Sequence, residues 1–576
     1  MVLHTTQDRL LQLVAYSIVI AAFVISIAFP IVLQFTEPFA VPTAVYSELI
    51  VNGGHLAQGA SVLPPTQVFW GSALSAEIQY PIGSILVSVF MLISGIPFQY
   101  AMFIPLAAIG NIIYFVLAKY IFSSITSNKG LVWFFSALFY LFFAVSTIED
   151  GTVGRASLGI MFLAFFIYVY LRFAREIKVP SSRSYHFGSV VILLLLVLAI
   201  GFLYYFATID IIALMMLIII STTLAKSALP RKRPWLEWSI LVIALFLFVG
   251  KTFMVEQIQT TTITQMFSSF VQYIGSMVGN LGIKLNWLNT QPTLWNINLV
   301  HLDPITSFGS RVFLITQYSS IIVIIACIFA YRPRKGQRSP KDVVWLFCVF
   351  ILFSSFGELG YLTVGPYSPL RILLWFGPIV TLSVVIGVIS ESDKIGKLKF
   401  DKPKFVKLKL AIAVLVISLF CISIWGELRV ATTYGIGDAK PFAYENVYTF
   451  SNFICTHTTN EKPLVLTSDE NYAANVFFIS SLNNKTASVI AAPLLGDAIT
   501  LNEAIATGDS QVFVSAMQSR QIQYLLIISD GKPIYGDVWG YIINDPNTDT
   551  ISQLQFALIY DDGQAQLFQV FPGSGS

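Results

Sequence analysis

Charge is scarce in this chain. Only 11% of its 576 residues are charged, whereas 56% are hydrophobic. A soluble fold would have too few polar side chains to cover so many apolar ones, so we expect a polytopic membrane protein. The formal net charge is only +3, and the basic residues gather in short loops, which argues against a nucleic-acid partner.

Cysteine is scarce as well. Cys327, Cys348 and Cys421 lie inside apolar runs, and Cys455 stands alone outside them. This pattern indicates neither an intrachain disulfide framework nor a cysteine metal cluster. A cleavable signal is not expected, because the first apolar run is long enough to span a membrane and lacks a small-residue cleavage site.

Long apolar runs, in contrast, are abundant. A membrane helix needs about 20 apolar residues. Eleven runs qualify: 10–33, 99–121, 130–147, 154–172, 188–207, 209–226, 236–254, 312–331, 342–360, 370–390 and 409–426. The run 81–96 is ambiguous, because it is short, begins at a proline and ends at Gly95-Ile96-Pro97.

The positions of the basic loops resolve this ambiguity. If 81–96 spans the membrane, the basic loops fall on both sides and contradict the positive-inside rule. If it lies in the interface or re-enters, all of them fall on one side: Lys119–Lys129, Arg172–Arg183, Lys226–Arg233, Arg332–Lys341 and Lys394–Lys409. We therefore expect a cell-membrane protein with a cytoplasmic N-terminus and a short outer turn near Asp210.

Two domains are expected. Residues 1–426 form the transmembrane part, with outer loops 34–98 and 255–311, the second of these being partly an interfacial helix. Residues 427–572 regain soluble composition and predict an extracytoplasmic α/β domain. Its short β-rich runs are Leu464–Leu466, Gln523–Ile528, Phe556–Tyr560 and Gln566–Val570. Residues 573–576 are a Gly-Ser stretch typical of an added linker.

The first outer loop carries acids in a chain that has few of them. Glu37 follows the first apolar run directly, and Glu48, His55 and Tyr80 lie further along the loop. Acids at a membrane face suggest a functional site. The alternative is that they only keep the loop hydrated, or that Glu48 caps a helix or pairs with a basic neighbour.

A second outer loop contains Glu149-Asp150-Gly151-Thr152 and then Arg155. On a turn, Glu149 and Asp150 can both reach one cavity. The same stretch also fits a turn and N-cap that lead into the fourth helix.

These features together resemble the GT-C superfamily of integral-membrane glycosyltransferases, which use polyprenyl-phosphate-linked sugars. The matching features are the acid after the first helix, the long first outer loop, and Tyr80-Pro81 before a non-spanning apolar helix. Gly95-Ile96-Pro97, Lys119-Tyr120, the second acidic loop and the soluble tail match as well. Two features depart from the family, since Glu37 stands where an aspartate is usual, and the Trp-Trp-Asp signature of oligosaccharyltransferases is absent from the tail.

The resemblance implies a mannosyltransferase- or arabinosyltransferase-like enzyme that moves one sugar to a lipid-linked glycan or protein acceptor. Inverting transfer needs a base for the acceptor hydroxyl and positive charge for the departing phosphate. Glu37 is the first candidate for the base, followed by Glu48 and Asp150. The absence of a glycine-rich phosphate loop favours a lipid-linked donor over a nucleotide sugar.

Three arginines near the outer ends of apolar runs are candidates for donor-phosphate binding, namely Arg155, Arg311 and Arg371. Arg371 is the best placed, because the turn Gly365–Pro369 precedes it and the GT-C resemblance puts an arginine near the donor phosphate. The alternatives are a salt bridge to Glu358 and snorkelling to the lipid headgroups.

A divalent cation, Mg²⁺ or Mn²⁺, is left open. His301 and Asp303 have a spacing that can present both to one metal on an extended segment, and His55 can join them. So few ligands make a weak metal signal. Two other functions also stay open, a transporter or flippase of lipid-linked glycans and a non-catalytic membrane assembly subunit, although no internal repeat typical of transporters is evident.

Overall fold

The computed structural model describes residues 2–33, 47, 50–51, 82–96, 101, 110–146, 155–176, 183–203, 205–224, 234–254, 304–331, 342–361, 371–395, 403–433, 444–457, 464–467, 476, 488–491, 523–528, 554–561 and 565–572. Contacts divide the chain into two units. The first contains Met1–Pro30 and Phe103–Gly437, and the second contains Ile31–Met102 and Asp438–Ser576.

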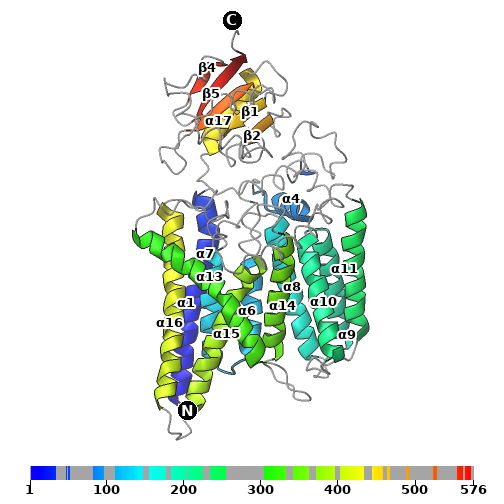
Figure 1. Cartoon of the computed structure of the whole chain (residues 1–576), viewed down its shortest axis with the longest axis vertical. Coiled ribbons are helices and arrows are strands. Elements are labelled where there is room, and N and C mark those ends of the chain that lie inside the picture. Colours follow the sequence, from blue (N-terminus) through cyan, green and yellow to red (C-terminus); the bar gives the residue numbers. More distant parts are fainter. Residues whose placement is uncertain are drawn as a thin grey trace, which may run out of the picture. The chain divides into compact units, whose positions relative to one another are not determined.

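The described residues of the first unit are helical apart from short turns (Figure 1). Its helices are α1 (Val2–Leu33), α6 (Asn111–Ser123), α7 (Lys129–Ser146), α8 (Arg155–Glu176), α9 (Arg183–Gly201), α10 (Tyr205–Leu224), α11 (Pro234–Met254), α13 (Pro304–Ala330), α14 (Asp342–Tyr361), α15 (Arg371–Ile395) and α16 (Pro403–Thr433). Each of the eleven predicted apolar runs overlaps one of these helices.

Ten of these helices have 18 residues or more. Within the part of the chain that the structure describes, the window Asp8–Ile27 of α1 alone meets the length and hydropathy requirements for a membrane span, and the other apolar stretches are shorter. The number of spans therefore stays a prediction.

Three boundaries differ from the sequence-based expectation. The turn between α9 and α10 lies at Phe202 and Leu203, so Asp210 lies within α10 instead of in the turn. α13 begins at Pro304, earlier than expected, because proline is well accommodated in the first turn of a helix. α16 continues past Gly426 to Thr433.

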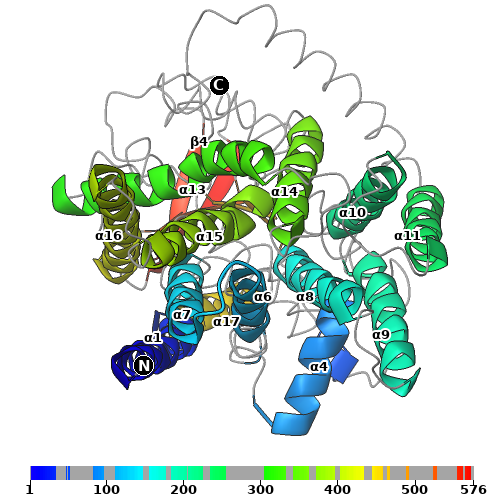
Figure 2. The ribbon, with the colours of Figure 1, turned by 90° about the horizontal axis from the view of Figure 1, so that it is seen from below.

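Two groups of helices pack closely within this unit. α13 contacts α14, α15 and α16, and it crosses the bundle obliquely (Figure 1). α9, α10 and α11 contact one another, and Figure 2 shows them on the opposite side of the bundle from α16. α10 and α8 connect the second group with the rest, because α10 also contacts α14, and α8 contacts α6.

α1 is fixed to α6 and α7 near its N-terminal end. The ring of Tyr16 lies 5.1 Å from that of Trp133, and Lys119 Nζ lies 3.5 Å from the centre of the same Trp133 ring. A methyl group at Gly130 would approach Asp8 Oδ1 to 3.0 Å. The start of α7 therefore accepts α1 because residue 130 has no side chain.

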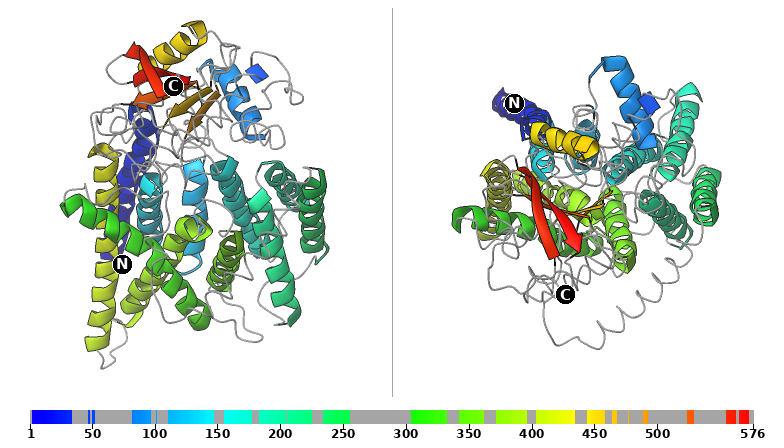
Figure 3. Two further views of the ribbon diagram at one scale, coloured as in Figure 1. Left: turned by 45° about the horizontal axis from the view of Figure 1, so that its top comes forward. Right: turned by 90° about the horizontal axis from the view of Figure 1, so that it is seen from above.

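The second unit contains α4 (Ile82–Ser94), α17 (Tyr444–His457) and a five-stranded sheet. The strands are β1 (Leu464–Thr467), β2 (Ser488–Ala491), β3 (Tyr524–Ile528), β4 (Leu554–Asp561) and β5 (Ala565–Pro572). Their order is β2-β1-β3-β5-β4, with β2, β1 and β3 parallel and β3, β5 and β4 antiparallel. Figure 3 shows β4 and β5 side by side.

Aromatic contacts attach α17 to the sheet. Phe450 and Phe453 pack on Tyr560 of β4, with ring centres 5.3 and 4.7 Å from the Tyr560 ring. Four of the strands coincide with the four runs that the sequence marks as β-rich, and β2 is the strand that the sequence does not indicate.

Candidate functional site

Four candidate residues of the first outer loop, Glu37, Glu48, His55 and Tyr80, lie outside the described residues. Ser47 is described and fully buried. It is the residue that precedes Glu48 in the sequence.

Two hydrogen bonds hold Ser47 against α4. The Ser47 hydroxyl donates to the carbonyl oxygen of Ser84 at 3.1 Å. The Ser88 hydroxyl lies 3.0 Å from the carbonyl oxygen of Ser47 and 2.7 Å from that of Ser84, so its one hydrogen is shared between these two acceptors. Because Ser84 and Ser88 are small, the backbone around Ser47 can approach the helix closely.

α4 has only 13 residues, or about 20 Å at 1.5 Å per residue. It ends at Gly95, whose φ of 67° is a conformation that glycine adopts without steric cost. The Gly95 amide donates to the carbonyl oxygen of Met91 at 2.9 Å, and the Ile96 amide donates to the Ser94 hydroxyl at 3.2 Å. The helix is therefore stopped by specific contacts, and it is shorter than a membrane span.

Two of the candidate arginines begin helices. α8 starts at Arg155 and α15 starts at Arg371, and the side chains of both residues lie outside the described part of the structure. A helix N-terminus presents unpaired amides and the positive end of the helix dipole, which favour a nearby anion. Arg311 differs, because it lies inside α13 and has an exposed side chain.

An aromatic cluster supports the first turns of α15. Trp375, one helical turn beyond Arg371, lies with its ring centre 6.1 Å from that of Tyr114 in α6 and 5.8 Å from that of Phe143 in α7. Phe376 lies 6.1 Å from the same Tyr114 ring. Edge-on contacts of this kind stabilise a defined geometry, so the position of the Arg371 backbone depends on buried rings below it.

Glu149, Asp150, His301 and Asp303 also lie outside the described residues, so the capping and metal hypotheses for them stay predictions. Where the structure does describe side chains, it brings no three of His, Cys, Asp and Glu together as metal ligands. α8 begins one residue after the predicted start of the fourth apolar run.

Asp210 is a candidate that the sequence-based reasoning set aside, because it placed this acid at a helix junction. Its side chain is 3% exposed, and it lies beside the Ser354 hydroxyl, which is also buried, where α10 packs on α14. A buried carboxyl group in an apolar bundle is costly and is therefore a functional candidate by default. Its signal in the sequence is a single acid within an apolar run.

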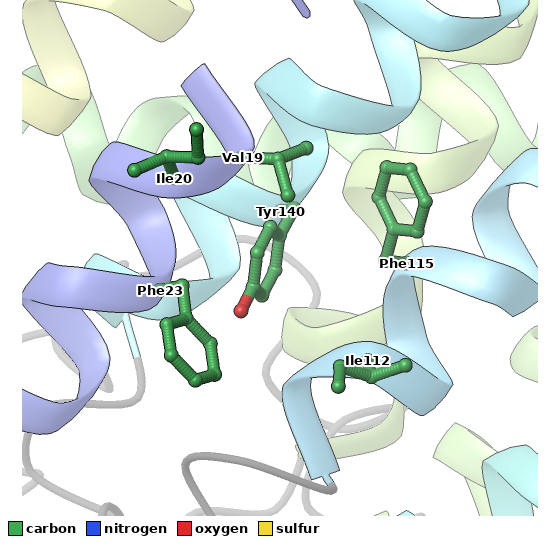
Figure 4. Close-up of a pocket in the computed structure, with 6 residues that line it drawn as sticks. All are labelled: Val19, Ile20, Phe23, Ile112, Phe115 and Tyr140. Carbon is green, nitrogen blue, oxygen red and sulfur yellow. The ribbon is translucent and has the colours of Figure 1, made fainter. Parts of the chain in front are cut away.

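A lateral groove lies between α1, α6 and α7. It has a volume of about 220 Å³ and is lined by Val19, Ile20, Phe23, Ile112, Phe115 and Tyr140 (Figure 4). Its lining is apolar apart from the Tyr140 hydroxyl, and Ile20 and Ile112 are largely exposed. The groove suits a hydrocarbon chain and offers no set of polar groups for a sugar.

A comparison with solved structures supports the architecture that the resemblance implied. The structure of the archaeal oligosaccharyltransferase AglB from Archaeoglobus fulgidus, in complex with an inhibitory peptide and a dolichol-phosphate, is similar to this chain with a TM-score of 0.52. The two sequences are 11% identical, and the similarity covers 97% of this chain and 74% of AglB. At this identity the likeness establishes the fold and not the reaction.

ArnT from Cupriavidus metallidurans, in the apo state, is also similar, with 11% identity, a TM-score of 0.46 and coverage of 98% of each chain. That score is too low to support an inference. No protein-family model matches the sequence, and no curated protein matches it significantly.

Proposed function

We propose that this chain is a membrane glycosyltransferase that transfers a sugar from a polyprenyl-phosphate donor to a lipid-linked glycan or protein acceptor at the extracytoplasmic face. The observation that carries this proposal is the GT-C-type fold, which extends over 97% of the chain. The AglB structure that shares this fold holds a dolichol-phosphate and an inhibitory peptide, which supports a lipid carrier as donor and leaves the acceptor open.

The proposed topology places the N-terminus in the cytoplasm, and the loop 34–98 and the domain 427–572 outside. It follows from the one-sided basic loops. The 13-residue length of α4 supports it, because this helix is too short to add a span that would reverse the later loops.

The proposed reaction is an inverting displacement. The Glu37 carboxylate takes the proton of the acceptor hydroxyl while that oxygen bonds to the anomeric carbon, and the bond from this carbon to the phosphate oxygen breaks. The electron pair of that bond leaves with the polyprenyl phosphate. Glu48 and Asp150 are the next candidates for the base.

Arg371 is proposed to bind the departing phosphate, assisted by Arg155 and Arg311. Its position at the start of α15 supports this role, because the guanidinium and the helix N-terminus both favour an anion. No step is assigned to a divalent cation, because His301 and Asp303 lie outside the described residues.

The test is sugar transfer by the purified protein from a set of polyprenyl-phosphate sugars, comparing wild type with Glu37→Gln and Arg371→Lys. Losing a general base costs about 10²- to 10⁴-fold in rate, so Glu37→Gln should lower turnover by that factor. Arg371→Lys should weaken donor binding, because it keeps the charge but loses the bidentate geometry.

Glu176→Gln, at the opposite end of α8 from Arg155, is the matched control and should keep wild-type activity. Near wild-type transfer by Glu37→Gln would remove Glu37 as the base and move the search to Glu48. An absence of transfer with every donor, together with movement of a labelled lipid-linked glycan across proteoliposome membranes, would favour a flippase.

A further inference from the structure

A lysine and a tryptophan lie next to the lateral groove between α1, α6 and α7. Lys119 of α6 holds its ammonium nitrogen 3.5 Å from the centre of the Trp133 ring of α7. Phe115, which lines the groove, has its ring centre 5.6 Å from that of the same Trp133. Phe115 and Lys119 are four residues apart on α6, so they share one face of that helix and lie about 6 Å apart along its axis. A cationic group therefore adjoins an apolar groove.

The other two helices of the groove contribute to the same arrangement. On α1, the Tyr16 ring lies 5.1 Å from that of Trp133, and Ile20, one turn later, lines the groove (Figure 4). On α7, Trp133 and Tyr140 are seven residues apart, which is two turns of one face. The Tyr140 ring lies 5.9 Å from that of Phe115. One continuous surface thus runs from the cation to the groove.

The charge of Lys119 is only partly compensated by its surroundings. The side chain is partly buried, and in the part of the chain that the structure describes its ammonium group contacts the face of Trp133 and pairs with no carboxylate. An aromatic face attracts a cation but carries no net negative charge. Basic side chains between membrane helices commonly bind the anionic head groups of lipids. Lys119 is therefore suited to an anion that comes from the bilayer.

The groove itself opens toward the bilayer. Ile20 and Ile112 in its lining are 64% and 51% exposed, and α1 contains the window Asp8–Ile27, which meets the requirements for a membrane span. An apolar cavity of about 150 Å³ can hold benzene, so the groove, with about 220 Å³, accommodates a stretch of one hydrocarbon chain. None of its six lining residues is charged.

We propose that Lys119 and the groove together bind one anionic glycerophospholipid of the bilayer, with its phosphate at the Lys119 ammonium group and part of one hydrocarbon chain in the groove. A phospholipid fits because its negative phosphate lies directly beside its apolar chains. This lipid site does not depend on the proposed glycosyltransferase function.

The position of Lys119 also indicates the leaflet. Trp133, which it contacts, lies one turn from the start of α7, and Tyr16 precedes the groove residues of α1. The lipid therefore belongs to the leaflet at the N-terminal ends of α1 and α7. In the proposed topology this is the cytoplasmic leaflet, whereas the donor phosphate is proposed to bind at the opposite face, so the lipid differs from the donor.

The test titrates the full-length protein in detergent with dioleoylphosphatidylglycerol or with the zwitterionic dioleoylphosphatidylcholine, and native mass spectrometry counts the bound lipids. The first phosphatidylglycerol should bind more tightly than phosphatidylcholine. Lys119→Gln should weaken its binding about fivefold, the effect of one basic residue near a membrane surface, and should leave phosphatidylcholine binding unchanged. Lys119→Arg keeps the positive charge and should retain the preference.

A second variant tests the groove and leaves Lys119 intact. Ile20→Trp should fill the groove and remove the tight phosphatidylglycerol site. Because Ile20 is 64% exposed, the larger side chain does not enter the packed interior, so this variant is informative even if Lys119→Gln does not fold. Leu13→Trp is the matched control, since Leu13 is 63% exposed on the same helix and does not line the groove. It should bind phosphatidylglycerol like wild type.

Two further controls separate this site from simpler explanations. Arg9→Gln removes an exposed cation from α1 and should leave the affinity for phosphatidylglycerol unchanged, because Arg9 takes no part in the site. Glycerol 3-phosphate, which has the anionic group but no hydrocarbon chain, should not displace the bound lipid.

Several outcomes would overturn the proposal. Unchanged phosphatidylglycerol binding in Lys119→Gln or in Ile20→Trp would remove the head-group contact or the chain contact. An equal loss in Arg9→Gln would indicate diffuse electrostatic attraction, and displacement by glycerol 3-phosphate would indicate a head-group site alone. Displacement by undecaprenyl phosphate at far lower concentration than by phosphatidylglycerol itself would assign the groove to the donor lipid.

Discussion

α15 packs against its neighbours through two different kinds of interface. On one side, Trp375 and Phe376 meet the rings of Tyr114 and Phe143. On the other, Gly377 lies against Ser320 of α13, and a methyl group at 377 would collide with the Ser320 hydroxyl. The first interface depends on large side chains that fill space. The second depends on the absence of a side chain at Gly377.

The small-residue interface continues from α13 to α16. A methyl group built on Gly426 would lie 2.5 Å from the Cα atom of Gly309, and one built on Gly309 would lie equally close to Gly426. In a membrane, such contacts allow close helix packing, which compensates for the weak hydrophobic driving force between helices. We therefore expect opposite sensitivities, with the aromatic side failing when atoms are removed and the small-residue side failing when atoms are added.

The largest effect is expected on the aromatic side. Trp375→Ala should lower the free energy of unfolding by about 3–5 kcal/mol, because it leaves a cavity between three helices. Trp375 is only 6% exposed, so almost all of its surface lies against protein and not against lipid. Unfolding in mixed detergent micelles, followed by the remaining tryptophan fluorescence, measures the loss.

Trp375→Phe is the matched control. It keeps an aromatic ring, so it should cost markedly less than the alanine variant. If Trp375→Ala were as stable as wild type, the cluster would not be supporting the first turns of α15, and its link to the position of Arg371 would fail.

The second effect concerns added atoms. Gly426→Ala should lower the free energy of unfolding by about 1–3 kcal/mol, the usual cost of overpacking. The atoms that the new methyl group meets belong to the backbone of Gly309, which cannot rotate away as a side chain can. The same unfolding titration applies.

Gly250 in α11 provides the contrast, because a methyl group there meets no atom within 4 Å. Gly250→Ala should be neutral or stabilise the helix by up to about 1 kcal/mol, since alanine has the higher helix propensity. Equal costs at the two glycines would show that helix propensity and not packing controls the effect.

Both interfaces bear on what the sequence can predict. The apolar runs located the helices well, because hydropathy and span length are local properties. Strand β2 escaped prediction because only two of the residues in Ser488–Ala491, Val489 and Ile490, are large and apolar. The break after Gly201 was predicted too far along the chain, because apolar residues continue through it. Which glycine meets which depends on helix pairing, and a single sequence does not contain that information.

The candidate site also combines features that the sequence predicts with features that depend on distant parts of the chain. The sequence singled out Glu37, Glu48 and Arg371 by their place at predicted membrane boundaries, and their roles stay proposals. It could not have indicated that Ser47 is bonded to α4, because the partners lie 37 and 41 residues away. Likewise, Asp210 gains significance only when α14 brings Ser354 beside it.

The smallest effect is expected for the hydroxyl pair within the small-residue interface. Thr316 Oγ1 of α13 and Ser423 Oγ of α16 lie 2.9 Å apart. Each hydroxyl also bonds within its own helix, Thr316 to the carbonyl oxygen of Val312 at 2.8 Å and Ser423 to that of Leu419 at 2.7 Å. Because each hydroxyl has one hydrogen, the bond between the helices competes with these local bonds.

We therefore expect a coupling free energy of only about 0.6 kcal/mol between Thr316 and Ser423, close to the average for hydrogen bonds between membrane helices. A double-mutant cycle of Thr316→Val, Ser423→Ala and their combination measures it in the same unfolding assay. Valine keeps the shape of threonine, so packing changes little. A coupling above about 2 kcal/mol would exceed the range measured for such pairs, and it would mean that polar bonding, rather than the close approach of Gly309 and Gly426, holds α13 to α16.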